Sequence, residues 1–478
     1  MKKLHVYPFF KTHLADLDTP LSCYYKLKTA YPDSPSFLLE SVESAGRLGR
    51  YSFIGFDPFC TFKSKGKKVV IEGNIKEEFF VENPFQVLKD FMKNFIPHKT
   101  MDELRFSGGA VGYVGYDVVR FFEKLPDISP HKLDIFDMFF IIPKKLVIFD
   151  NFTHKMTLVS LNYSNKPSHK SQEKDIIELN KIHNILKNPV KKPKKVNFSL
   201  GNIKSLTKKK DFEDMVKKAK EYICNGDIIQ VVLSQRFKAD ITADGLDLYR
   251  ALRVINPSPY MFFLDFCDYN LIGSSPEILV RLEKNEVEVR PIAGTRKRGT
   301  TLEEDKFLEE ELLNDKKECA EHVMLVDLGR NDIGRIAKIG TVTVPEFMII
   351  EKYSHVMHIV SSVKGLLKDG MDGFDVFKAT FPAGTVTGAP KIRAMEIIEE
   401  LESLKREFYA GGVGYFGFNG NMDFCITIRT MLQKGKSVYI QAGAGIVADS
   451  IPENEYNETL NKAMALMKSI TDLQEILE

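Results

Sequence analysis

The chain of 478 residues contains no tryptophan, although it has 35 phenylalanines and 17 tyrosines, so large aromatic side chains as such are not avoided. Cysteine is also scarce. The six cysteines lie far apart and form no CxxC pair, which argues against a zinc site and against a disulfide framework. This cysteine usage is typical of a protein of the reducing cytoplasm.

Neither an excess of charge nor a long apolar run is present. Lys and Arg number 67 against 65 for Asp and Glu, a net charge of +2, so no broad field would attract a polyanion and we expect no nucleic-acid partner. The opening MKKLHVYPFFKTHLADLD lacks the apolar core of a signal peptide, and no later run is long enough to cross a bilayer. We therefore expect an untargeted protein with no membrane partner.

The order of predicted elements indicates an α+β fold. Residues 36–160 read as short strands with turns, including a hairpin in KVVIEGNIK, a glycine-rich GGAVGYVGYD and a strand pair in FFIIPKKLVIFDNFTHKMTLVSL, with one helix in NPFQVLKDFMKNF. After residue 206, helices such as DFEDMVKKAKEYICNG and strands such as IIQVVLSQRF follow without a βαβ rhythm. GGVGYFGF, CITIRTML and SVYIQAGAGIV are typical of adjacent antiparallel strands.

Three segments follow from this pattern. Residues 1–165 predict a β-rich N-terminal domain, and residues 206–470 predict a larger domain of packed antiparallel sheets flanked by helices. Between them, residues 166–205 are rich in Lys, Asn, Ser and Pro, with one helix around residues 173–186, and predict a linker or surface excursion.

Two pairs of glutamates are the first candidate site. Glu318 and Glu321 lie in KKECAEHVMLVDL, and Glu455 and Glu458 lie in PENEYNETLNKAMALM. Each ExxE pair projects from one face of a predicted helix, and carboxylates converging from two helices are ligands that Mg²⁺ prefers. Spacing alone favours solvated helix faces over a metal site, and Glu458 also stands four residues before Lys462, as in a surface ion pair.

Two glycine-rich turns and a histidine pair are further candidates. FPAGTVTGAPKIRAMEIIEELE enters a helix whose N-terminus could hold a carboxylate, or Thr387 could be an ordinary N-cap with Pro390 in the first turn. AGAGIVADSIPENE permits close backbone approach to an anion at Gly443 and Gly445. In the strand-like SHVMHIVSSVKG, His358 could act as an acid or base, whereas His355 is interpreted as structural.

Taken together, these segments resemble the chorismate-utilising enzyme family, and within it the anthranilate synthases. The matching stretches are GDIIQVVLSQRF, NPSPYMFFL, GSSPEILVR, RPIAGTRKRG, AEHVMLVDLGRNDIGRI, SHVMHIVSSVKG, FPAGTVTGAPKIRAMEIIEELE, GGVGYFGF and AGAGIVADSIPENEYNET. They cover nearly all of residues 226–460 in the family's order. The N-terminal half matches more loosely through FLLESVESAGRLGRYSFIGFDP.

The resemblance implies roles for individual residues. Glu318, Glu321, Glu455 and Glu458 would hold Mg²⁺, which would bind the ring carboxylate of chorismate with help from Lys462. Arg429, Tyr409 and the backbone of Gly443, Ala444 and Gly445 would bind the enolpyruvyl carboxylate. Gly294 and Thr295, with Thr385 and Glu277, would surround the ring hydroxyl and the nucleophile. His358 would help to remove the C2 proton, and Glu277 would assist departure of the hydroxyl.

The resemblance also implies partners and an inhibitor. The reaction would convert chorismate and ammonia to anthranilate and pyruvate, and no GxCxG elbow of a glutaminase occurs in the chain, so a glutamine amidotransferase subunit would supply ammonia. A heterotetramer with two of each subunit is expected. LLES and NPSPYM resemble a feedback site for L-tryptophan, lined by Glu40, Ser41, Pro259, Tyr260 and Met261. Core packing of Leu38, Leu39 and Met261 is the alternative.

Two other functions compete with this interpretation. One is aminodeoxychorismate synthase component I, which aminates a different ring carbon, and the other is a non-catalytic sensor that uses the tryptophan pocket alone. Ala293 stands where the resembling aminodeoxychorismate synthases carry a lysine, and Gln230 stands where water-using members carry a lysine that activates water. Both positions favour direct addition of ammonia, and four carboxylates without a metal would be costly in a mere sensor.

Overall fold

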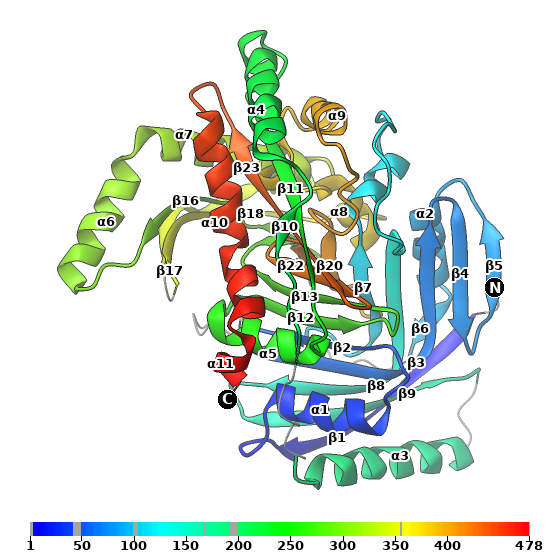
Figure 1. The fold of residues 1–478 in the computed structure, drawn as a ribbon. Helices are drawn as coiled ribbons and strands as arrows, with labels where there is room; N and C mark the ends of the chain where they lie inside the picture. Colours follow the sequence, from blue (N-terminus) through cyan, green and yellow to red (C-terminus); the bar gives the residue numbers. More distant parts are fainter. Residues whose placement is uncertain are drawn as a thin grey trace.

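The computed structural model describes residues 3–41, 49–98, 104–165, 169–190, 198–353 and 356–477 (Figure 1). The elements of its first part are β1 (Leu4–Leu14), α1 (Pro20–Ala30), β2 (Ser36–Glu40), β3 (Tyr51–Lys65), β4 (Lys68–Gly73), β5 (Glu77–Phe80), α2 (Pro84–Met92), β6 (Phe95–Pro97), β7 (Gly109–Val114), η1 (Tyr116–Phe121), β8 (Met138–Asp150), β9 (Lys155–Tyr163) and α3 (His169–Lys187). The predicted helix in NPFQVLKDFMKNF is therefore confirmed as α2, which Asn83 caps by accepting from the Gln86 amide at 3.0 Å.

The remaining elements alternate irregularly between helix and strand. They are β10 (Lys204–Ser205), α4 (Lys209–Cys224), β11 (Gln230–Asp240), α5 (Gly245–Ile255), β12 (Tyr260–Asp265), β13 (Tyr269–Ser275), β14 (Ile278–Glu283), β15 (Glu286–Val289), β16 (Ile292–Lys297), α6 (Leu302–Asn314), α7 (Lys316–Gly334), β17 (Thr343–Lys352), β18 (Val356–Leu366), α8 (Gly373–Thr380), η2 (Gly384–Val386), β19 (Gly388–Ala389), α9 (Lys391–Leu401), β20 (Gly412–Gly417), β21 (Met422–Ile426), β22 (Thr430–Lys434), β23 (Ser437–Ile446), α10 (Pro452–Thr471) and α11 (Leu473–Leu477). The predicted α+β class with antiparallel sheets is confirmed.

The long antiparallel pair of β3 and β8 belongs to two sheets. The first half of β3 pairs with β2, and its second half pairs with β4. On the other side of the pair, the second half of β8 pairs with β9 and its first half pairs with β7. One sheet then continues from β2 through β12, β13, β22 and β23 to β11, and the other continues from β7 through β20, β21, β14 and β15 to β18. Strands from both sides of residues 166–205 thus share each sheet.

The first of these sheets is buried on both faces. Along β12, Phe262 and Leu264 belong to the core between the sheets, whereas Phe263 between them packs in a second core beneath the helices. Neighbouring β2 alternates in the same way, with Phe37 in the first core and Leu38 in the second. Two-sided burial explains why these strands read as continuous apolar runs rather than as alternating patterns.

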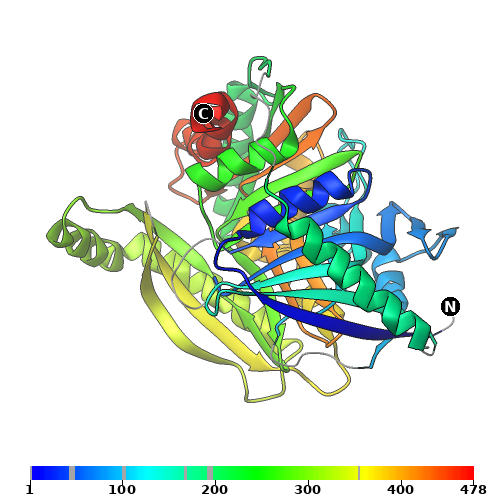
Figure 2. The ribbon, with the colours of Figure 1, turned by 90° about the horizontal axis from the view of Figure 1, so that it is seen from below.

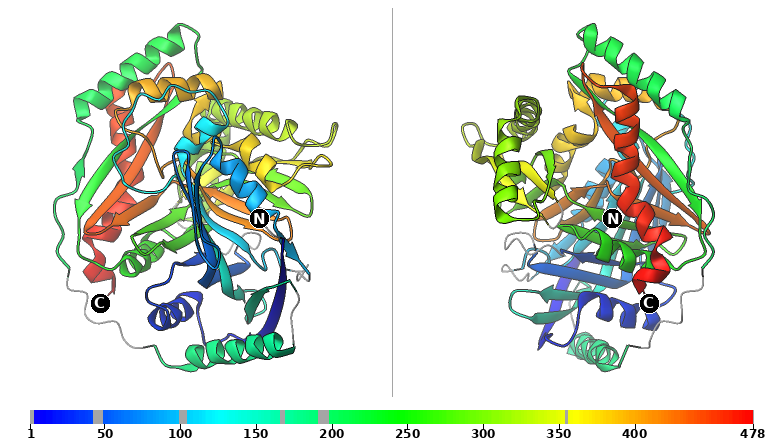
Figure 3. Two further views of the ribbon diagram at one scale, coloured as in Figure 1. Left: turned by 90° about the vertical axis from the view of Figure 1, so that its right-hand side faces the viewer. Right: turned by 60° about the vertical axis from the view of Figure 1, so that its left-hand side comes forward.

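Helices cover the outer face of this sheet. Figure 2 shows α1 and α3 lying across the strands of the N-terminal part, and Figure 3 shows α4 and α10 on one side of β23 and β11. The predicted helix at residues 173–186 is confirmed as α3, and residues 191–197 of the predicted linker lie outside the described residues. Within the described part of the chain, no helix is both long and apolar enough to span a membrane.

Two local predictions were wrong. CITIRTML forms two strands, β21 and β22, because Arg429 between them has a left-handed φ of 50° that interrupts the extended backbone. Thr387 is not a helix N-cap: α9 begins after Pro390, since Gly388 and Ala389 are held extended by pairing with Val231 and Gln230 of β11.

Candidate active site

The two glutamate pairs lie on helices α7 and α10, as the sequence predicts. Burial, together with repulsion from Glu321, raises the pKa of Glu318. Burial also raises the pKa of Glu455, to which Glu458 adds repulsion. The charge of Lys317, which precedes Glu318 on α7, lowers the pKa of Glu455 on α10.

The four carboxylates are suitable ligands for a divalent cation, but they are not spaced closely enough in this structure to bind one together. In the described ranges, no three acidic, histidine or cysteine side chains stand close enough together to hold a metal ion. Instead, Glu458 forms an ion pair with Lys462 at 2.6 Å, and Glu321 accepts from Gln230 Nε2 at 2.9 Å. Half-buried carboxylates that repel one another are a donor set that Mg²⁺ would neutralise.

The backbone of β23 lies close to side chains of several other elements. The carbonyl of Gly443 accepts from Lys462 Nζ at 3.1 Å, and a methyl group on Gly443 would lie 2.8 Å from the Tyr409 hydroxyl. A methyl group on Gly445 would lie 2.5 Å from Gln230 Nε2. Glycine is therefore required for this close approach. The Ala444 side chain points into the core beneath α4 and α9, so only its backbone can face the cleft.

Arg429 lies where several of these elements meet. Its charge interacts with Tyr409, Glu277 and Glu458, and burial lowers the pKa of its guanidinium. Its left-handed backbone is unfavourable for a residue with a side chain, so the surrounding strands must hold it in place. Within the described residues, its guanidinium forms neither a hydrogen bond nor an ion pair, which leaves the fork free for a ligand carboxylate.

Glu277, in the turn between β13 and β14, is the most strongly perturbed carboxyl in this region. Burial raises the pKa of Glu277 to about 7, against the opposing effects of Thr385, Lys462 and Arg429. The Thr385 hydroxyl faces it too loosely for a full hydrogen bond: its Oγ1 is buried and has no hydrogen-bond partner among the described residues. Near neutral pH, Glu277 can therefore hold or release a proton.

His358 on β18 is fixed by the neighbouring strand β16. Its Nδ1 lies 3.0 Å from the Gly294 carbonyl and 3.0 Å from Thr295 Oγ1. A carbonyl oxygen only accepts, so Nδ1 carries the proton and Nε2 keeps its lone pair. Burial lowers the pKa of His358, which keeps the ring neutral at pH 7. His355, predicted to be structural, lies outside the described residues.

These contacts join the predicted catalytic, substrate-binding and metal residues into one region, called here the acidic cleft. Gly294 connects the histidine to the carboxylates, since a methyl group there would lie 3.3 Å from Glu318 Oε2. The members of the acidic cleft are Glu277, Gly294, Thr295, Glu318, Glu321, His358, Thr385, Tyr409, Arg429, Gly443, Ala444, Gly445, Glu455, Glu458 and Lys462.

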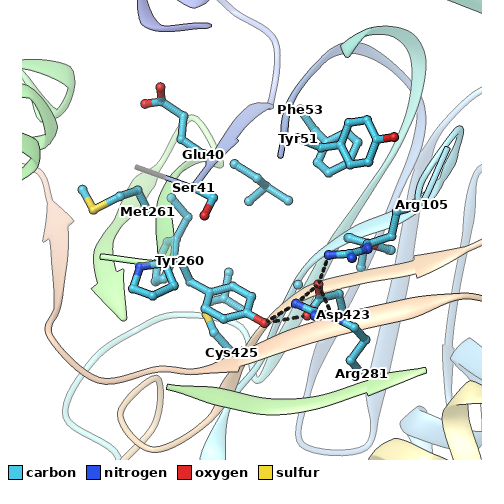
Figure 4. A pocket seen from close by; sticks show the side chains of 16 residues that line it. Glu40, Ser41, Tyr51, Phe53, Arg105, Tyr260, Met261, Arg281, Asp423 and Cys425 are labelled. Carbon is cyan, nitrogen blue, oxygen red and sulfur yellow. Dashed lines mark hydrogen bonds and ion pairs between the residues drawn. The ribbon is translucent and has the colours of Figure 1, made fainter. Parts of the chain in front are cut away.

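A second cavity, called here the strand cavity, lies between β2, β12, β20 and β21 (Figure 4). All five residues of the predicted tryptophan site line it, namely Glu40, Ser41, Pro259, Tyr260 and Met261. The Ser41 hydroxyl is buried and lacks a partner in the described part of the chain. The Glu40 carboxylate instead accepts from Tyr249 at 2.6 Å and pairs with Arg253 at 3.2 Å on α5.

The floor of the strand cavity is charged, which the sequence did not predict. Asp423 accepts from Tyr260 at 2.9 Å and from Arg281 Nε at 2.9 Å, while Arg105 lies 3.8 Å away. Figure 4 shows this group beneath the apolar walls. Tyr415 adds a buried hydroxyl that has no partner in the described ranges. The alternation of GGVGYFGF could have indicated Tyr415, but the partners of Asp423 come from three distant segments.

Comparison with known proteins places this geometry in a family. The chain matches a family model described as chorismate binding enzyme over residues 19–468. It is 49% identical to anthranilate synthase component 1 of Aquifex aeolicus, over 99% of this chain and 96% of that protein. It is 46% identical to anthranilate synthase component 1 of Acetivibrio thermocellus, over 99% and 97%. The crystal structure of anthranilate synthase component I from Streptococcus pneumoniae superposes with a TM-score of 0.80, at 41% identity, covering 89% of this chain and 93% of that one.

Proposed function

The chain belongs to the family of chorismate binding enzymes, and from this membership we propose that it is the chorismate-converting component of an anthranilate synthase. In the proposed reaction, ammonia adds to C2 of chorismate as the C4 hydroxyl leaves as water. Loss of pyruvate then makes the ring aromatic. The observation that carries the proposal is the guanidinium of Arg429, which has no ion pair among the described residues and lies in a cleft that also holds Lys462, because chorismate carries two carboxylates.

The two carboxylates of the substrate would bind to two different cations of the acidic cleft. Arg429 offers a planar fork to the enolpyruvyl carboxylate, with the Tyr409 hydroxyl above Gly443 and the backbone of residues 443–445 beside it. Lys462 would face the ring carboxylate. Holding both groups fixes the ring relative to Glu277 and His358, and such positioning is itself a large part of catalysis.

Mg²⁺ is the proposed cofactor, held by Glu318, Glu321, Glu455 and Glu458. Bound there, it would neutralise these carboxylates and polarise the ring carboxylate of the substrate. The raised pKa values of Glu318 and Glu455 support this, since each reflects burial beside another carboxylate.

Proton transfers are assigned to Glu277 and His358. With a pKa of about 7, Glu277 can give a proton to the departing C4 hydroxyl, and Thr385 would orient it. The lone pair on His358 Nε2 can accept the C2 proton during loss of pyruvate, because Gly294 and Thr295 hold Nδ1. Glu277 must carry a proton for its role, and His358 must be neutral for its own; burial favours both states.

The proposed setting is a cytoplasmic complex of tryptophan biosynthesis. Ammonia would come from a glutamine amidotransferase subunit in a heterotetramer with two of each subunit. L-Tryptophan would bind in the strand cavity, whose apolar walls suit an indole and whose unpartnered Ser41 hydroxyl can bind the amino acid's polar end.

Product analysis tests the function directly. Purified protein with chorismate, Mg²⁺ and ammonium should release anthranilate and pyruvate in equal amounts. Formation of 4-amino-4-deoxychorismate would identify the aminodeoxychorismate reaction instead, and no consumption of chorismate with intact tryptophan binding would identify a sensor. Ala293 and Gln230 favour the first outcome, since neither side chain can attack the ring or activate water.

A further inference from the structure

The acidic cleft and the strand cavity meet at the end of β13. Ser274 and Ser275 are fully buried there, and both pair with the wall of the strand cavity: Tyr260 lies opposite Ser275 and Met261 lies opposite Ser274. Two residues further on, the chain reaches Glu277 in the acidic cleft. This short stretch is thus the covalent and hydrogen-bonded boundary between the two sites.

The side chain of Ser274 is bound to the edge of the strand cavity. Its hydroxyl lies 2.8 Å from the Ser258 hydroxyl, accepts from Asn256 Nδ2 at 3.0 Å, and also contacts the Asn256 carbonyl. Ser258 directly precedes Pro259, which lines the strand cavity. Asn256 and Ser258 form this edge, so a shift of the edge would also move the Ser274 hydroxyl that is bonded to them.

The backbone of Ser274 is bound to the other site. Its N–H donates to the Arg429 carbonyl at 3.1 Å, and the preceding Gly273 pairs with Thr430, the residue after Arg429. Arg429 has a left-handed backbone, and no hydrogen bond from its own guanidinium fixes it among the described residues. The direction of the guanidinium therefore depends on the backbone contacts that hold residues 428–430.

We propose that Ser274 couples the two sites as a positioning residue. On the proposed function, from which this inference proceeds, an amino acid in the strand cavity displaces the Asn256–Ser258 edge, and Ser274 passes the displacement to the Arg429 backbone. The fork then turns away from the enolpyruvyl carboxylate. Binding of the inhibitor and binding of chorismate become mutually unfavourable, and this coupling has to be equal in both directions.

Ser275 shows why the coupling is specific to Ser274. Its hydroxyl, equally buried, donates to the Ile426 carbonyl at the end of β21 at 2.7 Å. In the described structure this hydroxyl forms no hydrogen bond with residues 256–258. Of these two adjacent serines, Ser274 alone bonds to the cavity edge through its side chain and to Arg429 through its backbone.

The test measures coupling separately from binding and turnover. For the complete protein and for Ser274→Ala, the KM of chorismate is determined with ammonium and Mg²⁺, with and without saturating L-tryptophan, and the Kd of tryptophan is measured by calorimetry. The ratio of the two KM values is the coupling factor. Ser274→Ala should lower this factor by at least about fivefold, within the range usual for coupling between sites, while tryptophan still binds and kcat without inhibitor persists.

Two variants complete the experiment. Ser469→Ala removes another fully buried hydroxyl, whose one hydrogen bond among the described residues goes to Leu466 O of its own helix at 2.7 Å, and should keep the coupling factor. Ser258→Ala cuts the same link from its other end and should lower the factor even if Ser274→Ala fails to fold.

Three outcomes would overturn the proposal. The first is an unchanged coupling factor in both Ser274→Ala and Ser258→Ala. The second is loss of tryptophan binding itself in Ser274→Ala, which would make the serine part of the pocket. The third is an unmodified protein that makes anthranilate but ignores tryptophan, which would leave the proposed reaction standing.

Discussion

The acidic cleft and the strand cavity share a border at β13, yet they are built in opposite ways. The strand cavity is walled by paired strands and floored by a closed set of hydrogen bonds among Arg281, Asp423 and Tyr260. The acidic cleft takes its residues from turns, helix faces and strand ends. The guanidinium of Arg429 in this cleft forms no ion pair in the described structure. A pocket whose charged floor is bonded within itself suits recognition of one shape, whereas an unpaired guanidinium and a carboxyl near neutrality suit chemistry.

The largest expected difference between the two sites follows from removing a charge from the acidic cleft. Glu458→Gln should lower kcat/KM on the order of 10²- to 10³-fold, the usual cost of losing one electrostatic group at a reacting centre. The side chain is 45% exposed, so the fold and tryptophan binding should persist. Assays at varied Mg²⁺ would measure this effect. The matched control is Glu453→Gln on the same helix, which loses only the pair of Glu453 with Lys209; full activity of Glu458→Gln would remove Glu458 from the metal site.

In the strand cavity, a substitution should instead weaken inhibition and leave turnover nearly unchanged. A bulky replacement such as Ser41→Phe should weaken tryptophan inhibition roughly 10- to 100-fold, because overpacking a closed pocket costs about 1–3 kcal/mol. Uninhibited turnover should stay near that of the unmodified protein. Inhibition curves and calorimetry measure both effects. If Ser41→Phe were inhibited normally, residues 38–41 would be core packing and no inhibitor site.

A lysine inside the acidic cleft should have a smaller effect on the reaction. Ala293→Lys should depress anthranilate formation about tenfold by filling the space of the incoming ammonia, a cost at the lower end of overpacking. Chromatography of the products separates slower anthranilate formation from a new product. Ala293→Met, similar in length but uncharged, should be depressed equally if crowding is the cause. Undiminished anthranilate formation by both variants would place the nucleophile elsewhere.

The smallest expected effect is a pH dependence that belongs to the acidic cleft alone. Burial raises the pKa of Glu277 to about 7 from an ordinary value of 4.5, so its acid form is lost as pH rises through neutrality. At a fixed concentration of free ammonia, kcat/KM for chorismate should fall about threefold between pH 6.5 and 7.5. Glu277→Gln should be slower and should lack this limb. The affinity for tryptophan should be flat over the same range, and a retained limb in the variant would assign it to another group.

Local signals in the sequence predicted much of this molecule, but long-range pairing was hidden. The N-cap residue Asn83 and the spacing of apolar residues indicate helix α2. Pro452 and the acidic residues of the first turn indicate helix α10. The split at Arg429 has no local signal, because its left-handed φ is imposed by strands that come from elsewhere in the chain. Thr387 looked like a cap for the same reason: extended pairing with β11 overrides the local preference.

The site was reached through motif resemblance more than through spacing. Spacing alone favoured solvated helix faces for the two ExxE pairs, and only the fold shows that a charge on α7 acts on Glu455 of α10. The charged floor of the strand cavity was missed because Arg105, Arg281 and Asp423 lie far apart in the sequence. A single sequence carries no signal for such a meeting unless the strand order is already known.

Sharing of sheets between the two ends of the chain also has a consequence during synthesis on the ribosome. Residues 109–114 of β7 pair with residues 412–417 of β20, and residues 37–40 of β2 pair with residues 261–264 of β12. While the chain emerges, the edges of these early strands stay unpaired until their partners, hundreds of residues later, have been synthesised. Contacts between such distant residues also form slowly. Open edges invite pairing with other chains. The nascent protein therefore spends its translation time exposed to aggregation, and its yield should depend on the rate of elongation and on chaperones that cover those edges.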